Sequence, residues 1–304
     1  MPGSDVPDLD EELRRRLGRR FGAAVEPWLD ALPPVLSDLA ERWHLALDSL
    51  IQRGSISVVI RCRTTAGRGA VLKISPNRTR ILDEAAALRR WTTNHVPAVL
   101  ALDEDAGALL IEAVQPGTAL DELPGYPRLE RVASLIRSLH AAGAPDPSYR
   151  PVADHIAYLY ESGKKNYERR PDLMRVVPPQ LYERGRRLAM RLAEDATASV
   201  LLHGDLTPVN ILDGGNERGL VAIDPAPCLG EPAFDAIDVV LWRTEDVATI
   251  ASRAEQLGPA IGADGGRLLA WCAAFAAMTA LELAEGGSPA ERVEHFIELA
   301  TDET

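Results

Sequence analysis

The amino-acid sequence predicts an α+β protein of two lobes: a small lobe built on an antiparallel sheet and preceded by a helical prefix, and a larger lobe that is mainly helical. Residues 55–63 and 69–75 are rich in β-branched side chains and flank a Thr-Thr-Ala-Gly-Arg turn, the pattern of a β-hairpin. Beyond Gln115-Pro116-Gly117, helical periodicity dominates the chain. A length of 304 residues is sufficient for two lobes.

The first 48 residues are expected to form the helical prefix, packed on the small lobe. Residues 9–24 have the pattern of an amphipathic, charged helix, and the apolar residues of segment 25–45 also recur at helical spacing. A proline inside a helix removes a backbone hydrogen bond and clashes with the preceding turn. Pro33-Pro34 is therefore expected to break the second helix.

Residues 49–115 are predicted to form the small lobe, with the order strand, strand, helix, strand, strand. The helix, residues 82–91, is composed of strong helix formers. The four strands are expected at 55–63, 69–75, 99–102 and 108–112.

Residues 116–304 are predicted to form the large lobe. Two short apolar strands, 199–202 and 219–223, flank a polar segment in its middle. The remaining periodic segments are predicted to be helices at 129–140, 153–170, 179–196, 234–257 and 265–285.

The composition indicates a soluble globular protein, with 46% hydrophobic and 26% charged residues. The most apolar stretch, 268–284, contains Thr279 and Glu282 and is too short for a membrane span. The acidic N-terminus lacks the apolar region of a secretory signal. Three widely spaced cysteines form neither a metal-binding pattern nor a disulfide framework. We therefore expect a cytoplasmic protein with no membrane partner.

The net charge of −12 disfavours a general nucleic-acid binder, which requires the opposite sign. The charge is also unevenly distributed: residues 1–116 carry a net charge of −1, and residues 117–304 carry −11. One interpretation is a solvated, soluble surface; another is that the large lobe receives a cationic partner. Only three of the 33 basic residues are lysines, so each lysine is a candidate for a position that arginine could not fill.

The segment His-Gly-Asp-Leu-Thr-Pro-Val-Asn, residues 203–210, carries the strongest chemical signal. Asp205 and Asn210 lie five residues apart, and Asp224 follows the next predicted strand. Phosphoryl transfer from ATP needs one carboxylate to orient the attacking hydroxyl, and an amide oxygen and a second carboxylate to hold Mg²⁺. Asp205 is the candidate for the first role, and Asn210 and Asp224 are the candidate metal ligands. The alternative is that these side chains only cap turns. In that case the three residue types would have to occur in this order and spacing by chance.

This motif, followed by Ile-Asp-Pro at 223–225, resembles the aminoglycoside phosphotransferase family, whose members are related to protein kinases. The segment from Asp224 to Asp235 and the prefix are most similar to the streptomycin 6-kinase and hydroxyurea phosphotransferase branch. The chain departs from many relatives in having Thr207 in place of a histidine. The resemblance implies a protein-kinase-like fold and the cofactors ATP and Mg²⁺. It also implies that His203 braces the catalytic loop, while Asp235 is expected to cap the helix that it begins.

The resemblance further implies a nucleotide site on the small lobe. Lys73, its only lysine, would hold the α- and β-phosphates and pair with Glu84 on the next helix. The alternatives are an exposed strand-edge lysine and an ordinary surface glutamate. A loop containing Ser55 and Ser57 would cover the phosphates, and adenine would bind at the lobe junction. The residues expected to supply backbone contacts to adenine run from Glu112 to Val114.

The phosphate acceptor is expected on the large lobe, within reach of Asp205. Streptomycin carries two guanidinium groups and one amine, for which carboxylates are suitable partners. Each candidate carboxylate taken alone could equally be a solvated surface charge. The candidates, from helices that the family uses for this pocket, are Asp154, Glu161, Glu282 and Glu285.

The sequence therefore predicts an ATP-dependent phosphotransferase that modifies a hydroxyl of a small cationic antibiotic, with streptomycin or a related aminoglycoside as the favoured acceptor. Alternative acceptors are hydroxyurea, a sugar or a metabolite such as choline or homoserine. A nucleotide-binding protein without useful turnover is the alternative from another class. The protein is expected to be a monomer or weak dimer that binds no nucleic acid. A metal hydrolase is disfavoured because no further histidine lies near His203 and Asp205.

Overall fold

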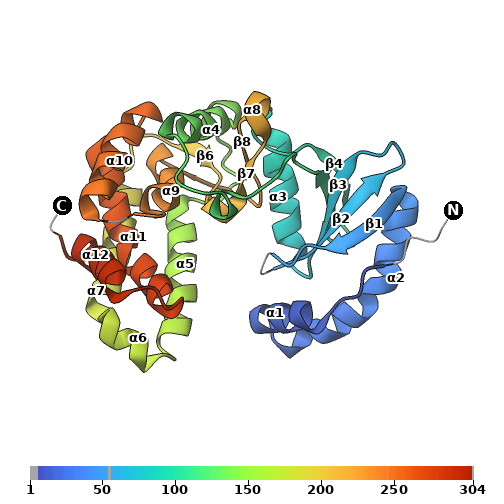
Figure 1. Ribbon diagram of the computed structural model, residues 1–304, viewed down its shortest axis with the longest axis horizontal. Helices are drawn as coiled ribbons and strands as arrows, with labels where there is room; N and C mark the ends of the chain where they lie inside the picture. The colour runs from blue at the N-terminus through green and yellow to red at the C-terminus, as the bar shows by residue number, and fades with distance from the viewer. Residues whose placement is uncertain (1–5, 54–55, 245, 303–304) are drawn as a thin grey trace. The chain divides into compact units, whose positions relative to one another are not determined.

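The computed structural model describes residues 6–53, 56–244 and 246–302 of the chain (Figure 1). The described chain divides into two compact units. Unit 1 comprises the chain up to Arg90 together with Val96–Gly117. Unit 2 comprises Trp91–His95 and Thr118 onwards.

Unit 1 is built on a five-stranded antiparallel sheet with the order β1-β2-β3-β5-β4. The first strand lies where the sequence analysis expected the end of the helical prefix. Leu45 and Leu47 are buried, whereas Ala46 and Asp48 are exposed, and this alternation is typical of a strand with one buried face. The strands are β1 (Leu45–Leu50), β2 (Val58–Thr64), β3 (Gly69–Ile74), β4 (Val99–Asp103) and β5 (Ala108–Glu112).

The prefix forms two helices, α1 (Glu11–Phe21) and α2 (Glu26–Arg42), and the predicted break at the two prolines is wrong. Helix α2 continues through Pro33 and Pro34, both of which lie on its exposed face. Each interior proline costs about 3 kcal/mol, whereas four buried leucines contribute about 6–12 kcal/mol. Burial therefore outweighs the lost hydrogen bonds. The four leucines are Leu29, Leu32, Leu36 and Leu39.

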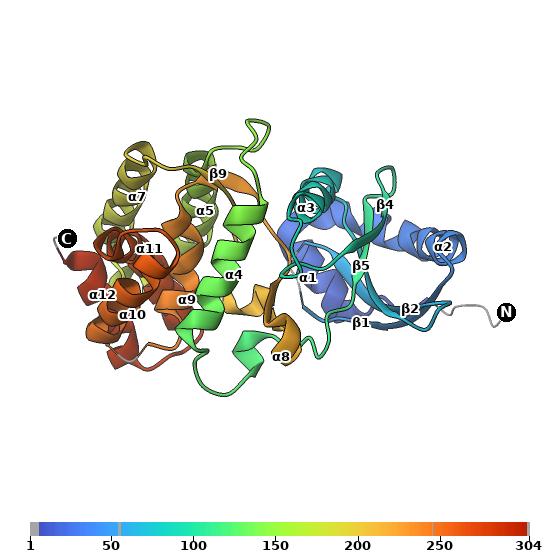
Figure 2. The same ribbon diagram turned by 90° about the horizontal axis from the view of Figure 1, so that it is seen from above.

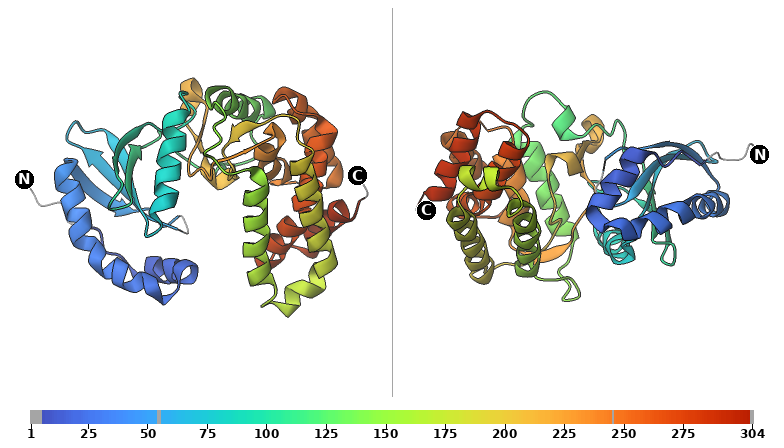
Figure 3. Two further views of the ribbon diagram at one scale, coloured as in Figure 1. Left: turned by 180° about the vertical axis from the view of Figure 1, so that it is seen from behind. Right: turned by 90° about the horizontal axis from the view of Figure 1, so that it is seen from below.

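The sheet lies between the prefix and helix α3 (Arg78–Arg90), as Figure 3 shows in its left view. Val58, Ile60 and Leu72 point from β2 and β3 into a core shared with leucines of α1 and α2. Successive side chains of a strand point to opposite faces. Lys73, next to Leu72, therefore points to the face covered by α3.

Unit 2 is mainly helical, and its longest helix, α11 (Gly265–Glu285), packs against α7, α9, α10 and α12 (Figure 2). Among the described residues, α11 is the one helix long and apolar enough to cross a membrane, but over half of its apolar window is buried in the unit, as in a core helix. The other helices are α4 (Leu129–Ala142), α5 (Val152–Tyr167), α6 (Pro171–Val176), α7 (Pro179–Glu194), α9 (Ile237–Leu241), α10 (Val247–Ala260) and α12 (Ala290–Thr301).

The predicted helix 234–257 is interrupted. A 3-10 turn, Pro232–Ala236, leads into α9, and the helical path then ends near Arg243, whose backbone has a φ of 49°. Such a left-handed conformation cannot continue a right-handed helix. The chain restarts at α10, where the Asp246 carboxylate accepts a hydrogen bond from the Thr249 amide as an N-cap.

Two short ladders hold the polar segment of unit 2. Strand β6 (Val200–Leu202) pairs with β9 (Cys228–Gly230), and β7 (Ile211–Asp213) pairs with β8 (Leu220–Ala222). The two strands predicted around this segment are present, but each has a partner that the sequence did not indicate. The architecture as a whole, a small antiparallel sheet in one unit and a helical majority in the chain, confirms the predicted α+β class.

Candidate active site

The β7–β8 hairpin brings the two predicted metal ligands to the same end of one ladder. Asn210 immediately precedes β7, and Asp224 lies two residues beyond β8. The Ile223 amide donates a hydrogen bond of 2.9 Å to the Asn210 carbonyl, which extends the pairing to the site. Asp205 lies in the loop that connects β6 to the 3-10 turn ending at Asn210. Local backbone pairing therefore gathers the three predicted side chains within one unit.

Asp235 anchors the loop that carries Asp205. Its carboxylate is buried and accepts hydrogen bonds from the His203 amide at 2.8 Å and the Gly204 amide at 2.9 Å. Its Oδ2 also lies 2.9 Å from Nε2 of His140 on α4. No side-chain cap forms at the start of the turn or of α9. The expectation that Asp235 caps its own helix is therefore wrong, because the carboxylate turns inward to the two loop amides.

The charge state of Asp235 follows from these contacts. Burial alone would raise the pKa of a carboxylic acid. In Asp235 the burial is outweighed by the hydrogen bond from His140 and its charge, and by the hydrogen bond from Gly204, so that its pKa lies below the usual value. The anchor is thus an ionised carboxylate near neutral pH.

The remaining backbone groups of the loop are also paired. The His203 carbonyl accepts from the Ala226 amide at 2.8 Å. The Gly204 carbonyl lies 2.7 Å from Nε2 of buried His155. The Asp205 carbonyl accepts from Nδ2 of Asn210 at 2.9 Å. Together with Asp235 and the His203 ring, these groups satisfy every backbone donor and acceptor of residues 203–205.

The His203 ring is a structural link in the loop. Its Nε2 lies 2.9 Å from the Ile223 carbonyl, and its Nδ1 accepts a long bond of 3.4 Å from the Asp205 amide. These contacts assign the proton to Nε2. The ring stacks on Trp91, with centroids 6.0 Å apart. His203 therefore joins the Asp205 loop to the strand end that carries Asp224.

Gly204 is the position in this loop that requires glycine. Its φ is 76°, and a Cβ atom there would lie 2.2 Å from the Ala226 carbonyl oxygen. Any side chain would push apart the two segments that the His203–Ala226 hydrogen bond holds together. The glycine thus permits the loop to pass close to the chain beyond Asp224.

The donor set fits a magnesium ion. Because Nδ2 of Asn210 is committed to the Asp205 carbonyl, its Oδ1 is the atom directed to a ligand. Asp224 adopts a left-handed conformation with φ of 59°, a sparsely populated region that places its carboxylate at the hairpin end. Within residues 6–53, 56–244 and 246–302, no three His, Cys, Asp or Glu side chains form a metal cluster. Mg²⁺ does not need such a cage, since it binds one or two carboxylates and takes further oxygens from phosphates and water.

In unit 1, Lys73 on β3 pairs with Glu84 on α3. The Lys73 ammonium lies 2.6 Å and 2.7 Å from the two carboxylate oxygens of Glu84. Both side chains are buried, with 5% and 2% of their surface exposed. The alternative, in which both residues are surface charges, is therefore wrong. A buried pair holds its geometry firmly, because separating the charges leaves each one unsolvated.

The loop predicted to cover the phosphates is described in part. Ser55 lies outside the described residues. Ser57 is buried just before β2. The neighbouring Ile56 carbonyl accepts a hydrogen bond of 2.5 Å from the Ser75 hydroxyl, two residues beyond Lys73. The end of this loop is therefore tied to the strand that carries the lysine.

The backbone predicted to contact adenine follows β5. The Glu112 amide donates to the Ala98 carbonyl, and the Ala113 amide donates to the Gly69 carbonyl. Within the described part of unit 1, no acceptor is present for the Val114 amide. Of the three predicted amides, that of Val114 is thus the one available to a ligand.

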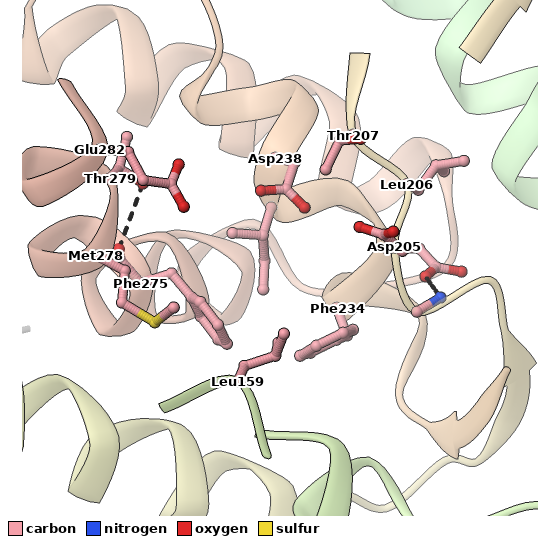
Figure 4. A pocket seen from close by; sticks show the side chains of 13 residues that line it. Leu159, Asp205, Leu206, Thr207, Phe234, Asp238, Phe275, Met278, Thr279 and Glu282 are labelled. Atoms are coloured by element: carbon pink, nitrogen blue, oxygen red, sulfur yellow. Dashed lines mark hydrogen bonds between the residues drawn. The ribbon is translucent and has the colours of Figure 1, made fainter. Parts of the chain in front are cut away.

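A pocket of about 140 Å³ lies beside Asp205 within unit 2 (Figure 4). This volume is roughly ten times what one water molecule requires, so the pocket can take part of a small molecule. Its polar side comprises Asp205, Thr207, Asp238 and Glu282, and its apolar side comprises Leu159, Phe234, Phe275 and Met278.

The pocket is strongly acidic. Protein burial, followed by the charges of Asp205, Glu282 and Asp235, raises the pKa of Asp238 to about 7. Burial and the charges of Glu285 and Asp205 raise the pKa of Glu282 as well. Both side chains are nevertheless exposed at the surface of the pocket, where solvent weakens the repulsion. Neither has a basic partner among the residues that the structure describes. A cation entering the pocket would relieve this repulsion.

The structure places one of the four predicted acceptor carboxylates, Glu282, in the pocket. Glu285, one turn beyond it, is 3.3 Å from Arg170 on the surface. Asp154 and Glu161 are exposed on α5 and do not line the pocket. Asp238 was not predicted, although it is the one charged residue of the apolar helix α9, three positions after Asp235. The available sequence signal was a single carboxylate, Asp238, placed one helical turn after Asp235 in an otherwise apolar segment.

Comparison with known protein families identifies one matching model. The model for aminoglycoside/hydroxyurea antibiotic resistance kinases matches residues 42–287. The streptomycin 6-kinase of Streptomyces glaucescens is 27% identical, with 95% of each chain covered. The hydroxyurea phosphotransferase of Kitasatospora aureofaciens is also 27% identical, over 88% of this chain and 76% of that protein.

Solved structures show the same fold at lower sequence identity. Choline kinase LicA from Streptococcus pneumoniae superposes with a TM-score of 0.57 and 16% identity, covering 89% of this chain and 99% of that chain. Spectinomycin phosphotransferase APH(9)-Ia, in complex with ADP and spectinomycin, has a TM-score of 0.54 and 14% identity, with 87% and 93% covered. The chain therefore has the protein-kinase-like fold of small-molecule phosphotransferases, as the sequence predicted.

Proposed function

The chain belongs to the aminoglycoside/hydroxyurea antibiotic resistance kinase family, and from this premise we propose that it transfers the γ-phosphoryl group of ATP to a hydroxyl of a cationic antibiotic. Streptomycin or a related aminoglycoside is the proposed acceptor. The observation that carries the proposal is the acidic pocket beside Asp205, which is large enough for part of a small molecule and has no cation of its own among the described residues.

In the proposed reaction, the Asp205 carboxylate orients the acceptor hydroxyl and accepts its proton. The hydroxyl oxygen forms a bond to the γ-phosphorus as the bond from that phosphorus to the β-phosphate oxygen breaks, which releases ADP. Asp235 and His155 hold the Gly204 backbone, and Asn210 holds the Asp205 carbonyl, so the loop that carries the base is fixed. The base therefore needs little reorganisation during the reaction.

Each unit has residues of its own that would bind part of the nucleotide. Lys73, oriented by Glu84, contacts the α- and β-phosphates, and the Val114 amide donates to adenine. In unit 2, Asn210 Oδ1 and Asp224 would hold Mg²⁺, which would supply positive charge to neutralise the phosphates. Support for ATP as the donor comes from solved neighbours, since one was determined with ADP and another with AMP.

The acceptor specificity is proposed to depend on charge. A guanidinium group can form two parallel hydrogen bonds to one carboxylate, which makes Asp238 and Glu282 suitable partners. Thr207 lines the same pocket, and its Oγ1 is buried without a hydrogen-bond partner in the described structure. A polar group of the acceptor would satisfy this hydroxyl.

Hydroxyurea is a second candidate acceptor, because a hydroxyurea phosphotransferase is as similar in sequence as the streptomycin kinase. Hydroxyurea carries no cationic group, so it would gain nothing from Asp238 and Glu282. We propose further that the enzyme acts in the cytoplasm, where ATP is available, as a monomer or weak dimer.

An acceptor panel tests the proposal. ADP release from MgATP would be measured with streptomycin, hydroxyurea, a sugar and choline, with the Asp205→Asn variant as the control for uncoupled hydrolysis. We expect streptomycin to give the largest kcat/KM. A response to hydroxyurea alone would replace the acceptor. Nucleotide binding without any acceptor-dependent release would overturn the assignment as a phosphotransferase.

A further inference from the structure

Helix α1 contacts the start of the loop that is proposed to cover the phosphates. Strand β1 ends at Leu50, and Gln52 lies in the connection that leads to β2. Nη1 of Arg16 donates to the Gln52 carbonyl at 2.8 Å and to its side-chain oxygen at 3.3 Å. The Gln52 amide nitrogen donates to Oδ2 of Asp10 at 2.6 Å. Gln52 is thus held by two residues of the prefix through its backbone and its side chain.

The far end of the same loop is also fixed. The Ser75 hydroxyl donates to the Ile56 carbonyl at 2.5 Å and accepts from the Asn77 amide at 3.1 Å. Ser75 is 1% exposed and directly follows β3. One end of the loop is therefore connected to the strand of Lys73, and the other end depends on α1.

The Asp10 carboxylate accepts hydrogen bonds from two segments, α1 and the loop after β1. Its Oδ1 accepts from the Leu13 amide at 2.8 Å, which makes it the N-cap of α1, while Oδ2 accepts from Gln52. The Leu13 amide, together with the weaker contributions of Gln52 and Arg16, lowers the pKa of this carboxylate. Since one carboxylate both begins the helix and holds Gln52, the position of Gln52 is coupled to that of α1.

Arg16 directs one nitrogen of its guanidinium group to Gln52 and leaves two others unpaired in the described structure. Its Nε and Nη2 are buried, and neither has an acceptor in the described part of the chain. Buried donors without partners oppose the favourable hydrogen bonds made by Nη1. The main consequence of Arg16 is therefore geometric: it determines where the Gln52 backbone lies.

We propose that α1 is a positioning element for nucleotide binding, in which Asp10 and Arg16 fix Gln52 and so set the entrance of the phosphate-covering loop. This inference rests on the proposed function. It assigns a role in nucleotide affinity to a helix that lies outside residues 42–287, the part matched by the family model. Asp10, Arg16 and Gln52 are positioning residues, since they act through the loop.

The test compares two variants of α1 with a variant of the loop. Arg16→Met removes both Arg16 contacts to Gln52, and Gln52→Ala removes the side-chain contacts to Arg16 and Asp10. Arg14→Met is the matched control, because Arg14 lies on α1 but pairs with Glu26 at 2.8 Å and Asp30 at 3.0 Å on α2. Binding of the fluorescent nucleotide mant-ADP with Mg²⁺, thermal unfolding, and KM and kcat would be measured for each protein.

We expect Arg16→Met and Gln52→Ala to weaken binding of mant-ADP about three- to tenfold, the effect of one or two partly exposed hydrogen bonds. KM for ATP should rise by the same factor, whereas kcat and the acceptor KM stay within twofold of wild type. The double variant should bind mant-ADP within about twofold of the weaker single variant, because both substitutions act on the position of the same residue, Gln52. Arg14→Met should bind nucleotide as wild type does.

Three results separate the possibilities. If the wild-type protein fails to bind mant-ADP, the proposed function and this inference are both overturned. If wild type binds and the Arg16 and Gln52 variants bind equally well, the inference alone is wrong and α1 only stabilises the fold. If Arg16→Met unfolds at the assay temperature, Gln52→Ala, which leaves α1 intact, decides the question by the same binding measurement.

Discussion

Two neighbouring regions of unit 2 differ sharply in how their polar groups are satisfied. In the loop of Asp205, every backbone donor and acceptor of residues 203–205 has a partner, supplied chiefly by Asp235 and His155. In the adjoining pocket, Asp238 and Glu282 face one another's charge without a basic partner among the described side chains.

The difference indicates what each region does. A catalytic base must be in place before the substrate arrives, so its supports are built into the protein. A binding pocket for a cation can leave its carboxylates unsatisfied, because the ligand supplies the missing charge. On the proposed function, the first arrangement should stabilise the folded protein, and the second should become favourable when a cation binds.

The largest effect should come from the base itself. Asp205→Asn preserves the shape of the side chain but removes the proton acceptor, so kcat should fall about 10³-fold or more. Binding of mant-ADP with Mg²⁺ should stay within threefold of wild type, since the loop supports are unchanged. Turnover within tenfold of wild type would show that Asp205 is not the base.

The second effect concerns the loop anchor. Asp235→Asn removes a buried charge that accepts two amide hydrogen bonds, so it should destabilise the protein by about 2–4 kcal/mol in urea unfolding. The same variant should lower kcat about 10- to 100-fold, because Asp205 loses its support. Asp172→Asn, which breaks the exposed pair with Arg170, is the control and should cost less than about 1 kcal/mol.

The loss of stability caused by Asp235→Asn should depend on pH in a defined direction. The folded pKa of Asp235 is lowered, so its contribution is present above the unfolded pKa and is lost as pH falls through the folded value. The stability difference between wild type and Asp235→Asn should therefore shrink in acid. An equal difference at pH 7 and pH 3 would contradict the assignment of an ionised anchor.

The third effect concerns the pocket and should have the opposite sign on stability. Asp238→Asn should raise KM for a cationic acceptor about tenfold, yet make the free protein more stable at pH 8. Its folded pKa is raised to about 7, so wild type loses stability as pH rises from the unfolded pKa to about 7, and the variant does not. Glu161→Gln on α5, outside the pocket, should change neither property. A destabilised Asp238→Asn variant would show that the carboxylate is a structural support.

The smallest effect is in the pH profile of acceptor binding. As pH rises from 6 to 8, Asp238 loses its proton, so KM for a permanently charged guanidinium acceptor should fall about three- to tenfold. Asp238→Asn should flatten this profile. An unchanged slope in the variant would mean that another group controls binding of the cation.

The convergence of the three candidate catalytic residues could be predicted because they are close together in sequence. Asp205, Asn210 and Asp224 lie within one hairpin and its flanking loop, where short-range pairing determines their positions. Strand β1 was missed because its six residues follow a helix without a glycine or proline between them. Its alternating burial depends on partners, such as Ile60, that lie later in the chain.

Asp235 and Asp238 show why the remainder required a structure. Both look like helix-terminal acids in sequence, yet the first points to backbone amides 32 and 31 residues earlier in the chain. The second lines a pocket with Glu282, which is 44 positions away. Long-range packing decides whether a carboxylate in such a position is a support, a ligand or a surface charge.

The buried pair of Lys73 and Glu84 has a consequence for chemical labelling. The chain contains only three lysines, and the other two, Lys164 and Lys165, lie together at the end of α5. A water-soluble acylating reagent will modify those two, because the Lys73 ammonium is enclosed and paired. A nucleotide that carries its own acyl group would instead deliver the reagent to Lys73. Mass spectrometry could then follow occupancy of the nucleotide site on a single peptide, with the α5 lysines as the internal standard.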